Sequence, residues 1–263
     1  MTAAPGQGGH VGEFKLFIAV SMTLLACGGC ETIYYSVTEA DRPDKSAALL
    51  VDPNAGPTVV PSCEGKAGCI SVLSYNLKHR DVPLQLEAVA RSMKSDCHQP
   101  DFILLQEVVF GRSRKMGHEN VGAALAELIG YDAEGAARED GTEGISILSK
   151  HPFDHFEFKH LDARDGWLSG GFPRVSVMGE FQLPELGRVR VVNVHLAHAP
   201  SSHDTRSAQL RETLEWMAAR QQEVPADVIF LGGDFNIEPQ WNELAIVQDH
   251  AASGDLEFAD FNS

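Results

Sequence analysis

The sequence predicts an α/β sandwich in which β-sheets are covered by helices. Two observations lead to this prediction. From Ile70 onward, short apolar runs with the composition of strands alternate with amphipathic segments that have the spacing of helices. In addition, a chain of 263 residues that is 43% hydrophobic can bury one sizeable core. We therefore expect one folded domain over residues 69–263, with additional sequence in front of it.

The N-terminal segment predicts export from the cytoplasm. Residues 16–26 form an apolar run of 11 residues after Lys15, whereas a helix needs roughly 20 residues to span a bilayer. This length fits the core of a signal peptide. Residues 24–27, Leu-Leu-Ala-Cys, resemble the cleavage site of bacterial lipoproteins, at which Cys27 would be lipidated. We expect a signal peptide of the lipoprotein type over residues 1–30. A buried N-terminal strand or helix is the alternative.

We therefore expect the protein to be periplasmic, anchored to a membrane through a lipid on Cys27, or secreted. Residues 31–68 are rich in Pro, Asp, Ala and Gly without clear periodicity, and they predict a linker. Cys63 and Cys69 flank a short flexible stretch that would close into a disulfide in an oxidising compartment. Ordinary thiols are the alternative for all five cysteines, whose spacing matches no zinc pattern.

The elements of the domain follow from composition and periodicity. Strand composition is found in six segments, at residues 70–75, 101–105, 144–148, 174–178, 189–194 and 228–231. Helical spacing of apolar residues is found in four segments, at residues 84–94, 119–129, 201–222 and 238–249. The nucleotide-binding patterns GxxxxGK[ST] and GxGxxG are absent from the sequence.

Polar side chains follow four of the predicted strands at their carboxyl ends. These residues are Asn76, Gln106 with Glu107, His195, and Asp234 with Asn236. Ligand sites in sheets flanked by helices tend to form outside the carboxyl ends of strands, so we expect these groups to converge. Carboxylate, amide and imidazole groups without thiolates suit a hard cation such as Mg²⁺ or Mn²⁺.

The charge of the chain limits its partners. The formal net charge is −16 and the sequence pI is near 5.0, which is the wrong sign for a protein that coats phosphate backbones by bulk electrostatics. A phosphate ligand would need a local cation. A bound magnesium ion would supply one and would polarise the phosphoryl group for attack by water.

Five motifs resemble those of the endonuclease/exonuclease/phosphatase superfamily, which includes DNase I, abasic-site endonucleases and neutral sphingomyelinases. The motifs are SYNL at 74–77, DFILLQEV at 101–108, ISILSKHP at 145–152, VNVHL at 192–196 and GGDFN at 232–236. The resemblance covers Ile70 to the end of the chain. It implies a DNase I-like sandwich of two mixed β-sheets flanked by helices, and a hydrolase of phosphoester bonds that is active as a monomer.

The resemblance also implies a role for each site residue. Glu107 would be the principal metal ligand, with Asn76 close to it and Gln106 supporting it on the substrate side. His195 would bind the phosphate, and Asp234 would orient or deprotonate the attacking water while Asn236 fixes its geometry. Arg174 would reach toward phosphate. Turn capping by Asn76 and a surface position for Arg174 are the alternatives without a function.

A second metal site is conceivable from the sequence, because His195, His198, His203 and Asp204 fall within ten residues. Imidazoles at this density bind zinc in some proteins. The HExxH pattern is missing, however, and Ala199-Pro200 interrupts any helix that would align them. We therefore expect His198 and His203 to be loop residues or residues at the edge of the substrate site.

The resemblance fails at the C-terminus. Members of the superfamily end with a Ser-Asp-His segment whose Asp-His pair works in acid-base catalysis, and nothing after Asn236 matches it. We therefore expect the last strands of the fold to be missing. Nucleic acid, a phospholipid headgroup or a small phosphoester would be the substrate. The alternative function is a non-catalytic domain that binds a phosphoryl ligand or another protein.

Overall fold

The structure is a computed structural model. It describes residues 15–21, 34–37, 49–50, 70–78, 83–95, 99–111, 120–164, 173–198, 203–236 and 246. All five cysteines, most of the predicted linker and most of the helix predicted at 238–249 lie outside these residues. The tether through Cys27 and the disulfide between Cys63 and Cys69 therefore stay predictions.

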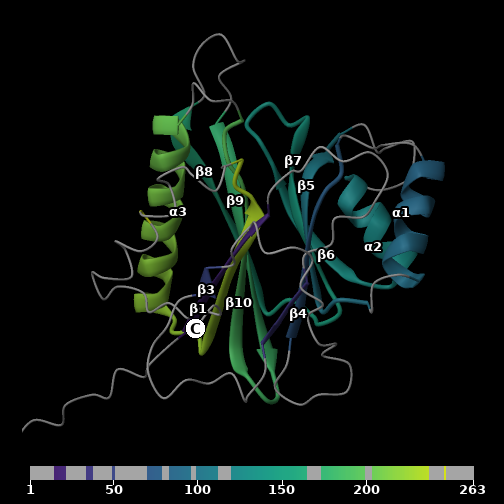
Figure 1. Cartoon of the computed structure of the whole chain (residues 1–263), viewed down its shortest axis with the longest axis horizontal. Coiled ribbons are helices and arrows are strands. Elements are labelled where there is room, and N and C mark those ends of the chain that lie inside the picture. The colour runs from purple at the N-terminus through teal and green to yellow at the C-terminus, as the bar shows by residue number, and fades with distance from the viewer. Residues whose placement is uncertain are drawn as a thin grey trace, which may run out of the picture.

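Two β-sheets pack face to face, and helices cover their outer faces (Figure 1). One sheet consists, in spatial order, of β3 (Leu49–Leu50), β1 (Lys15–Ser21), β11 (Val228–Asp234), β10 (Gly187–His195), β9 (Pro173–Leu183) and β8 (His155–Arg164). The other consists of β2 (Tyr34–Val37), β4 (Ile70–Asn76), β5 (Phe102–Val109), β7 (Glu143–Ser149) and β6 (Asp132–Ala137). Parallel and antiparallel pairs occur in both. The predicted sandwich of two mixed sheets is confirmed.

Alternation of side chains along the strands produces the layers. In β10, Val189 and Val191 point into the core between the sheets, whereas Val192 and Val194 point outward beneath a helix. The central core also contains Phe102 of β5 and Phe230 of β11. Because both faces of the central strands are buried, their sequences read as nearly continuous apolar runs.

Three of the predicted helices form. On the outer face of the five-stranded sheet lie α1 (Pro83–Ser95) and α2 (Val121–Ile129), and on the other side lies α3 (His203–Glu223) (Figure 1). Asn120 caps α2 by accepting a hydrogen bond from the Ala123 N–H at 2.8 Å, and Gly130 ends it in the left-handed conformation. In α3, Leu210, Leu214 and Met217 form the fully buried stripe.

Within the domain predicted over residues 69–263, two strands of the described residues are missing from the sequence prediction. β6 (DAEGAA) contains small and acidic residues that disfavour strands, and β8 (HFEFKHLDAR) is rich in charged and polar residues. Both occupy sheet edges, where a strand has only one partner and one face in contact with the core. Tertiary pairing with β7 and β9 therefore determines these strands, and local composition does not.

Residues of the predicted signal peptide also take part in the sheet. Lys15–Ser21 forms β1, which pairs in parallel with β11 from Lys15 opposite Val228 to Ser21 opposite Asp234. This placement corresponds to the alternative interpretation, a buried N-terminal strand, although it does not test whether the segment is removed. Among the residues that the structure describes, no helix is long and apolar enough to cross a membrane.

Candidate active site

The predicted site residues meet where the strands of the two sheets end. Asn76 of β4 pairs with Gln106 of β5, and His195 of β10 pairs with Asp234 of β11. Both pairs join parallel strands, so their carboxyl ends lie at the same edge of each sheet. Along β4, β10 and β11, the positions of Asn76, His195 and Asp234 share the face that carries the central core. The two sheets thus direct these side chains toward one another.

The amide of Asn76 connects the two sheets. Its Nδ2 donates to Oε1 of Glu107 at 2.9 Å and to Oδ2 of Asp234 at 3.1 Å. Asp234 is 3% exposed, so its carboxylate is almost fully removed from bulk water. A buried carboxylate requires such partners, because desolvation of an isolated charge is costly. Asn76 is therefore a bridge between two carboxylates that lie far apart in the sequence.

The backbone is held in an uncommon conformation at three of these strand ends. Of the non-glycine residues in the described ranges, only Lys78, Glu107 and Asn236 have positive φ, with values of 50°, 52° and 51°. Non-glycine residues rarely adopt this region, and they do so most often at functional sites. Side-chain hydrogen bonds stabilise two of the three: Asn76 Oδ1 accepts from the Lys78 N–H, and Asp234 Oδ1 accepts from the Asn236 N–H.

Glu107 owes its conformation to an irregularity in β5. The ladder between β5 and β7 pairs Leu105 with Ser146 and then Val108 with Gly144, so two residues of β5 face one residue of β7. Such a bulge redirects the side chains within it. Here it turns the Glu107 carboxylate toward Asn76.

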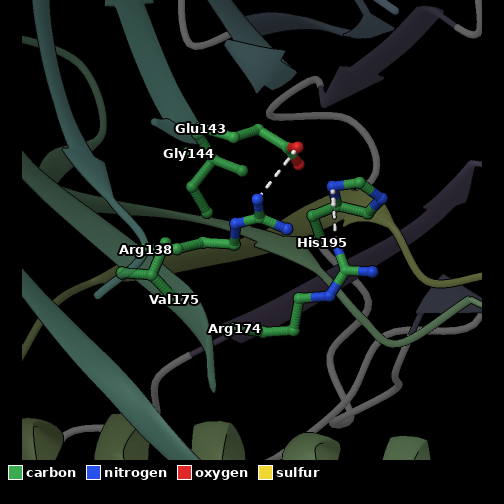
Figure 2. A pocket seen from close by; sticks show the side chains of 7 residues that line it. Arg138, Glu143, Gly144, Arg174, Val175 and His195 are labelled. Atoms are coloured by element: carbon green, nitrogen blue, oxygen red, sulfur yellow. Dashed lines mark hydrogen bonds and ion pairs between the residues drawn. The ribbon is translucent and has the colours of Figure 1, made fainter. Parts of the chain in front are cut away.

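A small pocket lies next to this group and is lined by residues of both sheets (Figure 2). About 170 Å³ of space, part of it open to solvent, lies among these residues, and its polar lining comes from Arg138, Glu143, Arg174 and His195. Nη1 of Arg174 lies 3.4 Å from Nδ1 of His195, and Nε2 of His195 lies 3.9 Å from Oδ2 of Asp234. His195 therefore connects the pocket to the carboxylates.

The environment of His195 favours the neutral imidazole. Burial and the neighbouring Arg174 guanidinium lower its pKa from 6.5 to about 4, and the carboxylates of Asp234, Glu107 and Glu143 only partly oppose this shift. A neutral ring has one N–H donor and one nitrogen acceptor. It is thus able to donate a hydrogen bond to an oxyanion or to accept a proton.

Two charged residues of this pocket are absent from the sequence prediction. Arg138 follows β6 and Glu143 begins β7, and Arg138 Nη2 lies 3.3 Å from Glu143 Oε2 and 3.2 Å from Asp140 Oδ2 (Figure 2 shows the first pair). Glu143 is only 8% exposed. The signal in the sequence is weak, because Arg-Glu-Asp-Gly-Thr-Glu at 138–143 reads as a polar turn until the hairpin is known.

Gln106 does not reach the pocket. It is 1% exposed, and its side-chain Nε2 donates to Asn193 Oδ1 at 2.9 Å and to the Leu104 carbonyl at 3.1 Å. Gln106 thus lies between the sheets, which corrects the predicted contact with substrate. Since β5 directs Gln106 toward the central core, it supports Glu107 only as its neighbour in the chain. Asn236 also binds inward: its Nδ2 donates to the Leu196 carbonyl at 2.9 Å.

The donor set fits a magnesium ion better than zinc. Magnesium is commonly bound by one or two carboxylates and otherwise by water and phosphate oxygens, and Glu107 provides one carboxylate beside the Asn76 amide. Zinc sites need three or four protein ligands. Among the described residues, which include His195, His198, His203 and Asp204, no group of three or more His, Cys, Asp or Glu side chains is arranged to hold a metal.

The fold thus brings carboxylates, an imidazole and an arginine together at the ends of strands from both sheets. The chain belongs to the Endonuclease/Exonuclease/phosphatase family, whose sequence model matches residues 73–254, well over half of its length. The resemblance of the five motifs is therefore confirmed. No curated protein matches the sequence.

Solved structures share the fold at low sequence identity. ANGEL2, described as a 2′,3′-cyclic phosphatase, is 20% identical with a TM-score of 0.53 over 68% of this chain and 56% of that chain. The catalytic domain of human Nocturnin is 18% identical with a TM-score of 0.51 over 70% of this chain and 69% of that one. TDP2 from C. elegans is 23% identical with a TM-score of 0.49, over 64% of this chain and 48% of that one. This chain thus spans about half of the length of the TDP2 structure.

Proposed function

We propose that the protein is a Mg²⁺-dependent hydrolase of phosphoester bonds. The observation that carries the proposal is the bridge of Asn76 between Glu107 and Asp234, next to His195 and Arg174. Two carboxylates, a neutral imidazole and a guanidinium in one place are the groups that phosphoryl transfer to water requires. Family membership supports the same reaction class.

Glu107 and Asn76 are the residues that would hold the metal ion. When bound, magnesium supplies positive charge to the phosphoryl oxygens and to the attacking water. Asn76 carries out its part by keeping the two carboxylates 2.9 and 3.1 Å from a single amide nitrogen, which limits their movement. The net charge of −16 makes such a local cation necessary for any phosphate ligand.

The remaining residues act on the phosphate and the water. Arg174 and His195 would bind the phosphoryl oxygens, and the neutral ring of His195 would donate its N–H to one of them. Asp234 would accept a proton from water or orient it, because its Oδ2 lies beside both Asn76 and His195. Asn236 would fix Asp234, since its N–H donates to Asp234 Oδ1 at 3.0 Å.

The substrate is proposed to be a small phosphoester or a lipid headgroup in preference to long nucleic acid. The negative net charge disfavours long polyanions, and Arg174 beside His195 offers local positive charge for one phosphoryl group. ANGEL2 is described as a 2′,3′-cyclic phosphatase and human Nocturnin carries a bound sulfate anion. Both descriptions are in line with recognition of a tetrahedral anion.

The test is an assay of the purified chain with Mg²⁺ against bis(p-nitrophenyl) phosphate, DNA, sphingomyelin and inositol phosphates. We expect turnover that is lost in excess chelator. Glu107→Gln should reduce turnover by ~100-fold or more, because the amide cannot replace the carboxylate as a metal ligand. Glu87→Gln is the matched control, since Glu87 is 48% exposed on α1 and should leave turnover unchanged.

Each result of this assay has a distinct meaning. Equal turnover with and without chelator would refute the metal-dependent mechanism. Phosphoryl ligand binding without turnover on any of the four substrates would refute the enzyme and favour the non-catalytic domain of the same fold. Equal loss of activity in Glu107→Gln and Glu87→Gln would indicate damage to the fold and would refute the role of Glu107.

We further propose that the chain is exported and anchored through Cys27, on the basis of the apolar run at 16–26 and the Leu-Leu-Ala-Cys motif. Processing would remove β1, so deletion of residues 1–26 should leave the melting temperature unchanged. Mass spectrometry of the protein from cells should show a lipid-modified N-terminus at Cys27. A lowered melting temperature together with an uncleaved N-terminus would instead establish β1 as a permanent strand.

A further inference from the structure

A buried asparagine connects the two sheets immediately behind the proposed site. Asn193 of β10 is fully buried, and its Nδ2 donates to two main-chain carbonyls of the opposite sheet, those of Leu105 and Ser146, both at 2.9 Å. Its Oδ1 accepts from Gln106 Nε2, also at 2.9 Å. An apolar residue would be expected at an interior position of this sandwich, so the polar side chain needs a specific reason.

The two carbonyls that Asn193 binds mark the start of the bulge in β5. Leu105 and Ser146 form the last regular pair before the register between β5 and β7 shifts, and the shift contains Glu107. The ladder to β4 continues as far as Gln106, but the ladder to β7 is interrupted within the bulge, so on that side other contacts must fix its conformation. Asn193 supplies such a contact from the facing sheet, because it binds the carbonyl of Leu105. Leu105 precedes Gln106 by one residue and Glu107 by two.

The same side chain also touches the strand that carries Asp234. A Cβ added at Gly233 would lie 2.8 Å from Asn193 Oδ1 and 2.1 Å from the carbonyl of Val194. The glycine before Asp234 thus leaves the space that Asn193 occupies. Asn193 itself precedes His195 by two residues on the same face of β10. Asn193 thus belongs to the strand that carries His195, and its amide binds β5, which carries Glu107, and lies close to β11, which carries Asp234.

We propose that Asn193 is a positioning residue, which sets the β5 bulge and so aligns Glu107 with His195 and Asp234. This inference rests on the proposed function. It adds a residue that positions Glu107, His195 and Asp234 to the residues that would bind metal, phosphate and water. Displacements on the order of 1 Å at a reacting group cost ~100-fold in rate. A fixed connection between the two sheets prevents the sandwich from sliding by such a distance.

The test compares Asn193→Ala and the nearly isosteric Asn193→Leu with Thr213→Val. Thr213 is a suitable control because it is also fully buried and hydrogen-bonded, to Ser176 and to the Gln209 carbonyl, but it lies between β9 and α3, away from the bulge. The first measurement is hydrogen exchange of the backbone amides of residues 104–110. We expect exchange to accelerate in both Asn193 variants by ~10-fold or more and to stay unchanged in Thr213→Val.

The second measurement is the dependence of turnover on substrate and on Mg²⁺ concentration. Both Asn193 variants should lower kcat by ~100-fold and should need ~10-fold more Mg²⁺ for half-maximal effect, while Thr213→Val should retain both values. Equal exchange and equal kinetics in the Asn193 and Thr213 variants would overturn the inference. If the wild-type chain has no turnover, the proposed function is refuted. The role of Asn193 is tested separately by hydrogen exchange: wild-type exchange rates at residues 104–110 in Asn193→Leu would show that Asn193 does not set the β5 bulge.

Discussion

His195 and Asp234 occupy paired positions on the parallel strands β10 and β11, and His195 Nε2 lies 3.9 Å from Asp234 Oδ2. At this distance the carboxylate attracts a charged imidazole without forming a hydrogen bond to it. Burial and Arg174 outweigh that attraction, and the pKa of His195 falls to about 4. A neutral imidazole thus lies beside the Asp234 carboxylate. This arrangement suits the proposed roles, in which Asp234 binds water and His195 donates a hydrogen bond to phosphate.

This pKa predicts that the fold loses stability when the pH falls from about 6.5 toward about 4. The unfolded chain takes up a proton at His195 near pH 6.5, whereas the folded chain does so only near pH 4. In this window the unfolded state binds more protons, so the free energy of unfolding decreases by up to about 1.4 kcal/mol per pH unit. Equilibrium urea unfolding at several pH values should show this slope, and His195→Gln should lack the contribution. Identical slopes in both proteins would contradict the prediction.

A second prediction concerns Gly233, whose φ is 132° and where an added Cβ would lie 2.1 Å from the Val194 carbonyl oxygen, so that no space is left for a side chain. Gly233→Ala should lower the free energy of unfolding by on the order of 2–4 kcal/mol. Gly130→Ala is the control: its φ of 80° is also positive, but a Cβ there meets nothing within 4 Å. That variant should lose only ~1 kcal/mol. Chemical denaturation of the two variants checks the difference, and equal losses would show that the contact with Val194 is harmless.

The sequence was sufficient to predict the sandwich and most of the site, for a physical reason. Strands buried on both faces are apolar, so the polar residues at their ends, such as Glu107 and Asp234, are conspicuous in the sequence. The register of parallel strands then brings these ends together without further information. For this reason the predicted convergence of Asn76, Glu107, His195 and Asp234 agrees with their positions in the structure.

Residues that depend on pairing between distant strands were not predictable. Arg138 and Glu143 belong to a hairpin whose first strand, β6, has no strand composition. The burial of Gln106 follows from Asn193 on the opposite sheet, a contact across 87 positions in the chain. Alternation along β5 does place Gln106 on the inner face, but only the position of the second sheet decides that its partner is a side chain and not a ligand.

A third prediction concerns Asp101, at the opposite end of the sheet from the site. Burial alone would raise its pKa, but the His151 imidazole, 3.6 Å away, and the hydrogen bonds from Ser71 bring the pKa below the usual 3.8. The stabilisation is present above pH 3.8 and is lost as the pH falls through the lower folded value. Asp101→Asn should therefore lose ~1–3 kcal/mol at neutral pH. The difference from wild type in urea unfolding should shrink below about pH 3.8, and a difference independent of pH would refute the role of the charge.

The last prediction concerns the ion pair between Glu180 and Arg190. Arg190 is fully buried, and its Nη2 lies 2.8 Å from Glu180 Oε1, which also accepts from Arg220 Nε at 3.0 Å. Burial would raise the pKa of Glu180, but the hydrogen bonds from Arg220 and Arg190 lower it below its usual value. Glu180 is therefore charged at neutral pH and balances a guanidinium that has no access to bulk water.

Removal of the buried Glu180 carboxylate should lower the free energy of unfolding far more than removal of an exposed carboxylate. Glu180→Ala leaves the Arg190 charge buried without its carboxylate and should lower the free energy of unfolding by ~3–5 kcal/mol. Glu87→Ala breaks an exposed pair with Arg91 and should lower it by less than ~1 kcal/mol. The double variant Glu180→Ala with Arg190→Met should regain part of the loss, because it removes the unbalanced charge. Urea unfolding of these three variants and of the wild type measures these values. A double variant less stable than Glu180→Ala would show that Arg190 stabilises the fold through its hydrogen bonds to Gln221 and Val224, and not through its charge.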